Sequence, residues 1–83
     1  MHDAEVIVHV RYDPKGDVIK IAEQPDGTTP QGWYNYLCTV IPASGFHPLS
    51  GGRAAIYMTH EQLATAKDLT GERLEIYKSV EWK

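Results

Sequence analysis

Residues 50–53 read Ser-Gly-Gly-Arg and have the residue types of an anion-binding loop. Consecutive glycines let backbone N–H groups converge on an anion, and an adjacent arginine offers a fork of donors to a carboxylate or phosphate. The pattern lacks the glycine spacing and terminal lysine of a P-loop, and a strand rather than a helix is expected after it. A small-ligand or anion site in the loop 44–53 is therefore one hypothesis, and a plain turn is the other. The ligand-binding residues of the first hypothesis are Ser50, Gly51, Gly52, Arg53 and the titratable His47.

The histidines and the single cysteine do not form a recognisable metal or catalytic motif. No two histidines are spaced i, i+4 for a helix or i, i+2 for a strand, so a zinc site would need ligands that converge from distant positions. Cys38 lies late in an apolar segment, without the cation or helix N-terminus that lowers a thiol pKa, and we expect it to be buried. We predict no catalytic residue, no metal site and no cofactor, although the small-ligand hypothesis leaves an enzyme open. The four histidines are His2, His9, His47 and His60.

Three large aromatic side chains lie close together at Trp33, Tyr34 and Tyr36. In a helix, Trp33 can face the core while the two tyrosines lie on other sides. Tyrosine and tryptophan are favoured at protein interfaces, so this segment, or a strand edge, is a candidate surface for a partner protein or for a homodimer. The alternative is that Tyr34 and Tyr36 only cover the edge of a sheet.

Composition narrows the class of protein. The 83 residues suffice for one domain, residues 1–83, and the net charge is −3. Basic residues are spread along the whole chain and do not form the concentrated positive field that nucleic acid requires, so we expect no nucleic-acid partner. The sequence shows no leader pattern and no apolar run long enough to cross a bilayer, and it has one cysteine. We therefore expect a cytoplasmic protein without a membrane partner.

The first half of the chain predicts two strands and a helix. Residues 4–12 alternate apolar and polar, and a turn at residues 13–16 leads to a second strand over residues 17–23. Thr29 and Pro30 have the types of a helix N-cap and first helical residue. Residues 30–41 favour a helix by the spacing of their apolar residues, although many of them are comfortable in a strand.

The second half predicts a loop, a strand, a helix and a last strand. Three glycines, two serines and one proline lie within the ten residues 43–52, which we interpret as the long loop, and a strand follows over residues 53–58. Thr59 and Gln62 have the spacing of a capping box, which starts a helix over residues 60–68. Apolar and polar residues alternate over residues 73–82, which predicts the last strand.

These elements predict an α+β domain in the order β-β-α-β-α-β, with a mainly antiparallel sheet of four strands and two helices on one face. The alternative is a small barrel-like β domain in which residues 33–41 form a strand. The leading functional hypothesis is a non-catalytic protein-interaction module, and the second is the small-ligand or anion-binding protein. The expected core residues are Val6, Val8, Val10, Ile19, Ile21, Trp33, Leu37, Ile41, Ile56, Met58, Leu63, Leu74, Ile76 and Val80.

Overall fold

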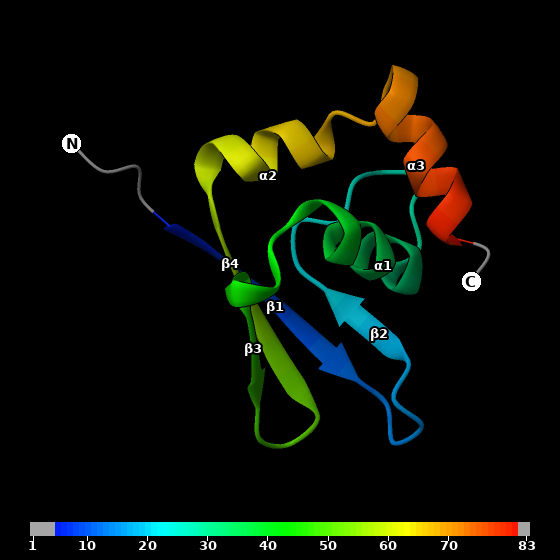
Figure 1. The fold of residues 1–83 in the computed structure, drawn as a ribbon. Coiled ribbons are helices and arrows are strands. Elements are labelled where there is room, and N and C mark those ends of the chain that lie inside the picture. Colours follow the sequence, from blue (N-terminus) through cyan, green and yellow to red (C-terminus); the bar gives the residue numbers. More distant parts are fainter. Residues whose placement is uncertain (1–4, 82–83) are drawn as a thin grey trace.

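In the computed structural model, which describes residues 5–81, four strands form one antiparallel sheet and three α-helices lie beside it (Figure 1). The α+β class with a four-stranded antiparallel sheet is thus confirmed, and the barrel-like alternative is wrong. The element order differs from the expected one at two places, described below. The elements are β1 (Glu5–Tyr12), β2 (Val18–Ile21), α1 (Pro30–Val40), the short 3₁₀ helix η1 (Ala43–Gly45), β3 (Phe46–Leu49), β4 (Arg53–Thr59), α2 (His60–Lys67) and α3 (Gly71–Glu81).

The strands lie in the order β2-β1-β4-β3, so that two hairpins local in the sequence are joined by the central pair β1 and β4. Alternate residues of this pair point toward the helices. Val8 lies opposite Ile56 and Val10 opposite Ala54, and all four side chains are buried. The period of two in the sequence therefore sets which face of the sheet meets the core.

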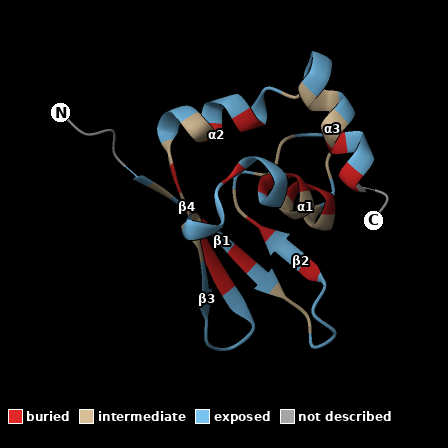
Figure 2. Cartoon of the chain, in the orientation of Figure 1, coloured by how far each residue is buried: buried red, intermediate tan, exposed pale blue. Residues whose placement is uncertain are grey.

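Helix α1 forms because its apolar stripe and its N-cap outweigh the strand preference of its aromatic residues. The Thr29 hydroxyl accepts the backbone N–H of Gly32 at 3.0 Å, and a proline occupies the first helical position. Trp33, Tyr36 and Leu37 lie at i, i+3 and i+4 and are all buried. Buried residues gather where α1 meets the sheet (Figure 2). Burial of this stripe decides between helix and strand.

Most of the expected core is buried, with one clear exception. Ile19 is 52% exposed, so its assignment to the core is wrong. Arg11 pairs with Lys20 and Tyr12 with Val18, which leaves Ile19 as the extra residue of a β-bulge. A bulge changes the alternation of faces, and sequence spacing alone does not reveal it. Val6, Leu74 and Ile76 are only partly buried, while Val18, Tyr36, Ala66 and Tyr77 join the core in addition to the expected residues.

The strand expected over residues 73–82 is wrong, because the chain forms helix α3 there; residue 82 lies outside the described residues. The segment is rich in glutamate, arginine, leucine and lysine, which are good helix formers. α3 packs mainly against α1. Tyr77 and Val80 point inward, and the Tyr77 hydroxyl accepts the backbone N–H of Thr29 at 3.1 Å. Contacts with a distant helix, rather than the local alternation, fix this segment.

The loop expected over residues 43–52 contains two short elements, η1 and the edge strand β3, so the fourth strand of the sheet comes from here. Phe46 lies opposite Ile56 and Leu49 opposite Arg53. Pro48 interrupts the pattern of a central strand, but an edge strand tolerates a residue without an N–H. The proline and glycine residues of this segment therefore led to the prediction of a loop where an edge strand forms.

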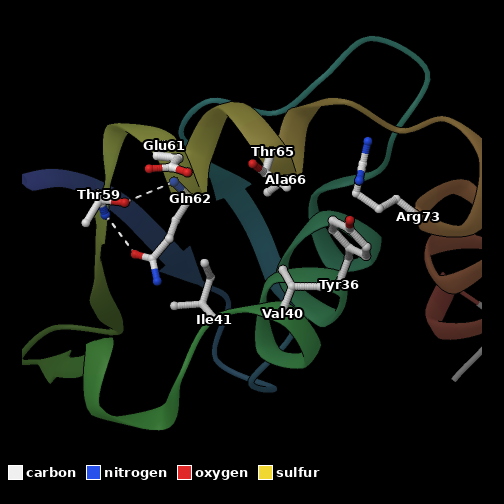
Figure 3. A pocket seen from close by; sticks show the side chains of 9 residues that line it. All are labelled: Tyr36, Val40, Ile41, Thr59, Glu61, Gln62, Thr65, Ala66 and Arg73. Carbon is white, nitrogen blue, oxygen red and sulfur yellow. Dashed lines mark hydrogen bonds between the residues drawn. The ribbon is translucent and has the colours of Figure 1, made fainter.

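The capping box at the start of α2 is present as expected. Gln62 N–H donates to the Thr59 hydroxyl at 3.0 Å, and Thr59 N–H donates to Gln62 Oε1 at 2.8 Å (Figure 3). We expect Thr59→Ala to lower the free energy of unfolding by about 1 kcal/mol, because an N–H at the helix start loses its acceptor. Urea denaturation followed by circular dichroism measures this. Thr65→Ala, on the exposed side of the same helix, is the matched control, and equal midpoints for the two variants would contradict the role of Thr59.

Candidate functional site

We call the face of the sheet turned away from the helices the open face; most of its residues are exposed, although Ala55 is buried and Tyr57 is half-buried. Residues of β1 and β4 that alternate with the core positions point there, together with their partners on β2 and β3. Ile7 and Leu49 are 42% and 45% exposed on this face. The open face consists of Glu5, Ile7, His9, Arg11, Lys20, His47, Leu49, Arg53, Ala55 and Tyr57.

Three cations form one row across the open face. Lys20 on β2 pairs with Arg11 on β1, and Arg11 pairs with Arg53 on β4. The ion pairs between residues 5 and 81 join Lys67 with Glu23 and Arg73 with Asp68, so none of the three belongs to one. Like charges directly opposite each other in a sheet are destabilising. The row is a concentrated positive charge on a chain whose net charge is −3.

A depression of about 490 Å³ lies along this row. Its lining includes His9, Arg11, Lys20, Leu49 and Arg53, and no acidic residue of the described chain lines it. The acidic residue of the open face, at the other end of β1, is six positions from Arg11 on an extended strand, which is roughly 20 Å. Guanidinium groups can hold carboxylates through paired hydrogen bonds, and the leucine offers apolar contact beside them.

The loop 50–52 makes the contacts of a tight hairpin. Gly51 and Gly52 have φ values of 77° and 71°, a conformation that side chains rarely allow. The Gly52 carbonyl accepts the backbone N–H of Tyr12 at 2.8 Å, and Arg53 Nε donates to the Ser50 carbonyl at 3.2 Å. The geometry of the turn therefore explains by itself why both of these residues are glycine. Arg53 belongs both to this loop and to the row of cations, and the sequence did not indicate this connection.

His47 and Arg53 share the open face but line different depressions. His47 lies opposite Ala55, two pairs along the ladder from the pair of Leu49 and Arg53. The His47 ring leans the other way, edge-on to Tyr57 with 4.8 Å between ring centroids. It lines a separate depression of about 430 Å³ that also includes Ser44. The expected joint site of the histidine and the arginine is therefore not formed in one cleft.

Two of the three aromatic residues of the candidate interface on the first helix are buried in the core. Trp33 and Tyr36 are both 0% exposed, with stacked rings 5.8 Å apart. Trp33 Nε1 donates to the Ala22 carbonyl at 3.3 Å. Tyr34 is half-buried, and its hydroxyl accepts from the Tyr12 hydroxyl at 2.9 Å. The physical reason is that α1 packs against both the sheet and α3, so its aromatic residues are covered on two sides.

Cys38 is exposed, so the expectation that it is buried is wrong. It lies on the side of α1 away from Trp33 and Leu37. Partial desolvation raises the pKa of the Cys38 thiol, and a hydrogen bond with Tyr34 opposes that rise; the thiol stays protonated at neutral pH. The raised pKa does not favour Cys38 as a thiolate nucleophile.

Within residues 5–81, no group of three histidine, cysteine, aspartate or glutamate side chains could hold a metal ion, and His2 lies outside this range.

The open face could not be predicted from the sequence because the grouping of its residues depends on strand register. Alternation in β1 places Ile7, His9 and Arg11 on one side, and this signal was visible. The partners of these residues on β2 and β4 come from pairing that the sequence does not state.

No helix in the described part of the chain is long and apolar enough to span a membrane. No protein-family model matches the chain, and neither the curated proteins nor the solved structures contain a match.

Proposed function

We propose that this protein is a non-catalytic interaction module whose open face binds an acidic segment of a partner protein. The observation that carries the proposal is the row of Lys20, Arg11 and Arg53, which has no acidic neighbour in its depression among residues 5–81. Carboxylates of a partner would relieve the repulsion within the row and gain charge-assisted hydrogen bonds. The free protein carries this repulsion, and the complex does not.

The shape of the surface favours the sheet face over a sheet edge. Edge strand β2 has four residues, and edge strand β3 contains Pro48, which has no N–H to offer to an added strand. The face, in contrast, offers the exposed Leu49 opposite Arg53, and the exposed Ile7 four positions from Arg11 along β1. A segment that alternates acidic and apolar side chains matches this mixture, since it satisfies charge and apolar contact together.

The same mixture favours a protein over a nucleic acid. Single strands are held by rows of exposed aromatic side chains on which bases stack. The aromatic residue of the open face is Tyr57, which is half-buried and lies against His47. Aliphatic side chains occupy the remaining apolar positions, and they suit a peptide.

The exposed Cys38 thiol fits a reducing compartment, so we place the partner in the cytoplasm.

Binding of a fluorescent peptide of alternating glutamate and leucine tests the proposal by anisotropy. We expect Arg11→Gln with Arg53→Gln to weaken binding by about tenfold or more, equivalent to about 1.4 kcal/mol. The melting temperature should stay equal or rise, because the substitution removes a pair of like charges. Added salt that shortens the Debye length from about 10 Å to about 3 Å should weaken binding by the wild type.

The matched control is Lys15→Gln with Lys78→Gln, which removes the same charge at exposed positions outside the open face. It should bind the peptide as the wild type does. Equal weakening by both double variants would reduce the effect to net charge and contradict the proposal. Tighter binding of a polyuridine strand than of the peptide would assign the face to nucleic acid, and self-association lost in the open-face variant would assign it to a second copy.

A further inference from the structure

A pocket of about 350 Å³ opens between α1 and α2 on the helix side of the sheet (Figure 3). Val40, Ile41 and Ala66 give it apolar walls, and the start of α2 gives it polar groups. Its volume is near the lower end of the range for small-molecule sites, roughly 300–1,000 Å³. The size and lining suit a compact molecule that is largely apolar.

The hydroxyl of Tyr36 is the unusual group in this pocket. Tyr36 is 0% exposed, and its hydroxyl has no hydrogen-bond partner in the part of the chain that the structure describes. In Figure 3 its ring extends from α1 toward α2 and ends near Ala66 and Arg73. A buried hydroxyl without a partner costs free energy, and native proteins leave few of them. A ligand oxygen in the pocket would provide the missing acceptor.

The charges around the pocket indicate what kind of ligand fits. Arg73 Nη2 is 2.7 Å from Asp68 Oδ2, and Arg73 Nε donates to the Asp68 carbonyl at 2.8 Å. The guanidinium is thus neutralised by its own partner, and Glu61 adds a negative charge to the lining. Burial raises the pKa of Tyr36, with Arg73 lowering it and Asp68 raising it further, so the phenol remains a hydrogen-bond donor. These charges disfavour an anion and favour an uncharged molecule.

We propose that this pocket binds a small uncharged organic molecule whose apolar body contacts Val40, Ile41 and Ala66 and whose carbonyl or hydroxyl oxygen accepts the hydrogen of the Tyr36 hydroxyl. Arg73 lines the same pocket and its side chain is 38% exposed, so the proposal includes a displacement of Arg73 that lets the ligand reach that hydroxyl. The site is on the other side of the sheet from the open face, so it does not depend on the proposed function.

Cyclohexanone, an uncharged ring with one acceptor oxygen, is the probe. We expect it to shift the amide NMR signals of Tyr36, Val40 and Ala66 in a saturable way. Tyr36→Phe should weaken binding by roughly three- to tenfold, the fold-change of one net hydrogen bond. Cyclohexanecarboxylate should bind more weakly than cyclohexanone because of the acidic groups beside the pocket.

Two control variants separate this site from general effects of the probe. Tyr57→Phe makes the same chemical change on the open face and should leave cyclohexanone binding unchanged. Thr65→Phe, at an exposed position of the lining, should block the pocket and abolish the shifts. The melting temperature of Tyr36→Phe without the probe should equal or exceed that of the wild type, because no hydrogen bond is lost.

Three results would overturn the proposal. Equal affinities of the wild type and Tyr36→Phe would show that the hydroxyl does not contact the probe. Tighter binding of the carboxylate would show that the site selects anions. A melting temperature of Tyr36→Phe several degrees below that of the wild type would show that the hydroxyl already has a partner in the folded protein.

Discussion

Replacing Trp33 with alanine is expected to lower the free energy of unfolding by about 3–5 kcal/mol, which is a large part of the stability of a domain this size. Trp33 is 0% exposed at the centre of the core, stacks on Tyr36, and donates a hydrogen bond to the Ala22 carbonyl. The truncation leaves a cavity between α1 and the sheet and an unpaired carbonyl. Urea denaturation followed by circular dichroism measures the loss.

The control for this large-to-small change is Ile19→Ala. Ile19 is 52% exposed at the bulge of β2, so its truncation should change the free energy of unfolding by no more than about 0.5 kcal/mol. A loss of about 1 kcal/mol or less in Trp33→Ala would mean that the core closes around the missing ring. A large effect in Ile19→Ala would contradict the exposed position of this side chain.

Gly45→Ala is expected to destabilise the protein by about 1–3 kcal/mol through overpacking. A Cβ atom at Gly45 would lie 2.5 Å from the backbone carbonyl oxygen of Tyr57. A side chain could rotate away, but this oxygen belongs to the central strand β4, so the backbone of η1 or of the sheet has to move. Thermal denaturation measures the effect.

Ser44→Ala is the neighbouring control, since Ser44 is exposed in the same short helix. It should melt within a degree or two of the wild type. If the two variants melted together, the close approach of η1 to β4 would not be a constraint on this position.

Local signals were sufficient where residues within one or two helical turns of each other fix a structure. Thr59 with Gln62, and Thr29 at the start of α1, specified two helix starts through hydrogen bonds within one turn. The stripe of Trp33 and Leu37 specified the buried side of α1. These elements could therefore be predicted without knowledge of the rest of the chain.

Long-range contacts decided the parts that could not be predicted. Leu74, Ile76 and Val80 fit a period of two, but the segment turns its Tyr77 toward α1 and forms a helix. Arg53 was recognised as a candidate binding residue, yet its neighbours Arg11 and Lys20 come from strand pairing that local patterns do not encode. The candidate site is a product of register, so only part of it could be found from the sequence.

The strand order also has a consequence for the path of folding. Each of the hairpins β1–β2 and β3–β4 joins strands that are close in the sequence, whereas the pair β1 and β4 joins the two halves of the chain. Hairpins form in about 1–10 μs, but the central pair must first overcome the entropy of closing the long connection between the halves. We therefore expect the pairing of β1 with β4 to form more slowly than either hairpin, and the cation row, which spans β2, β1 and β4, to be complete only after this pairing.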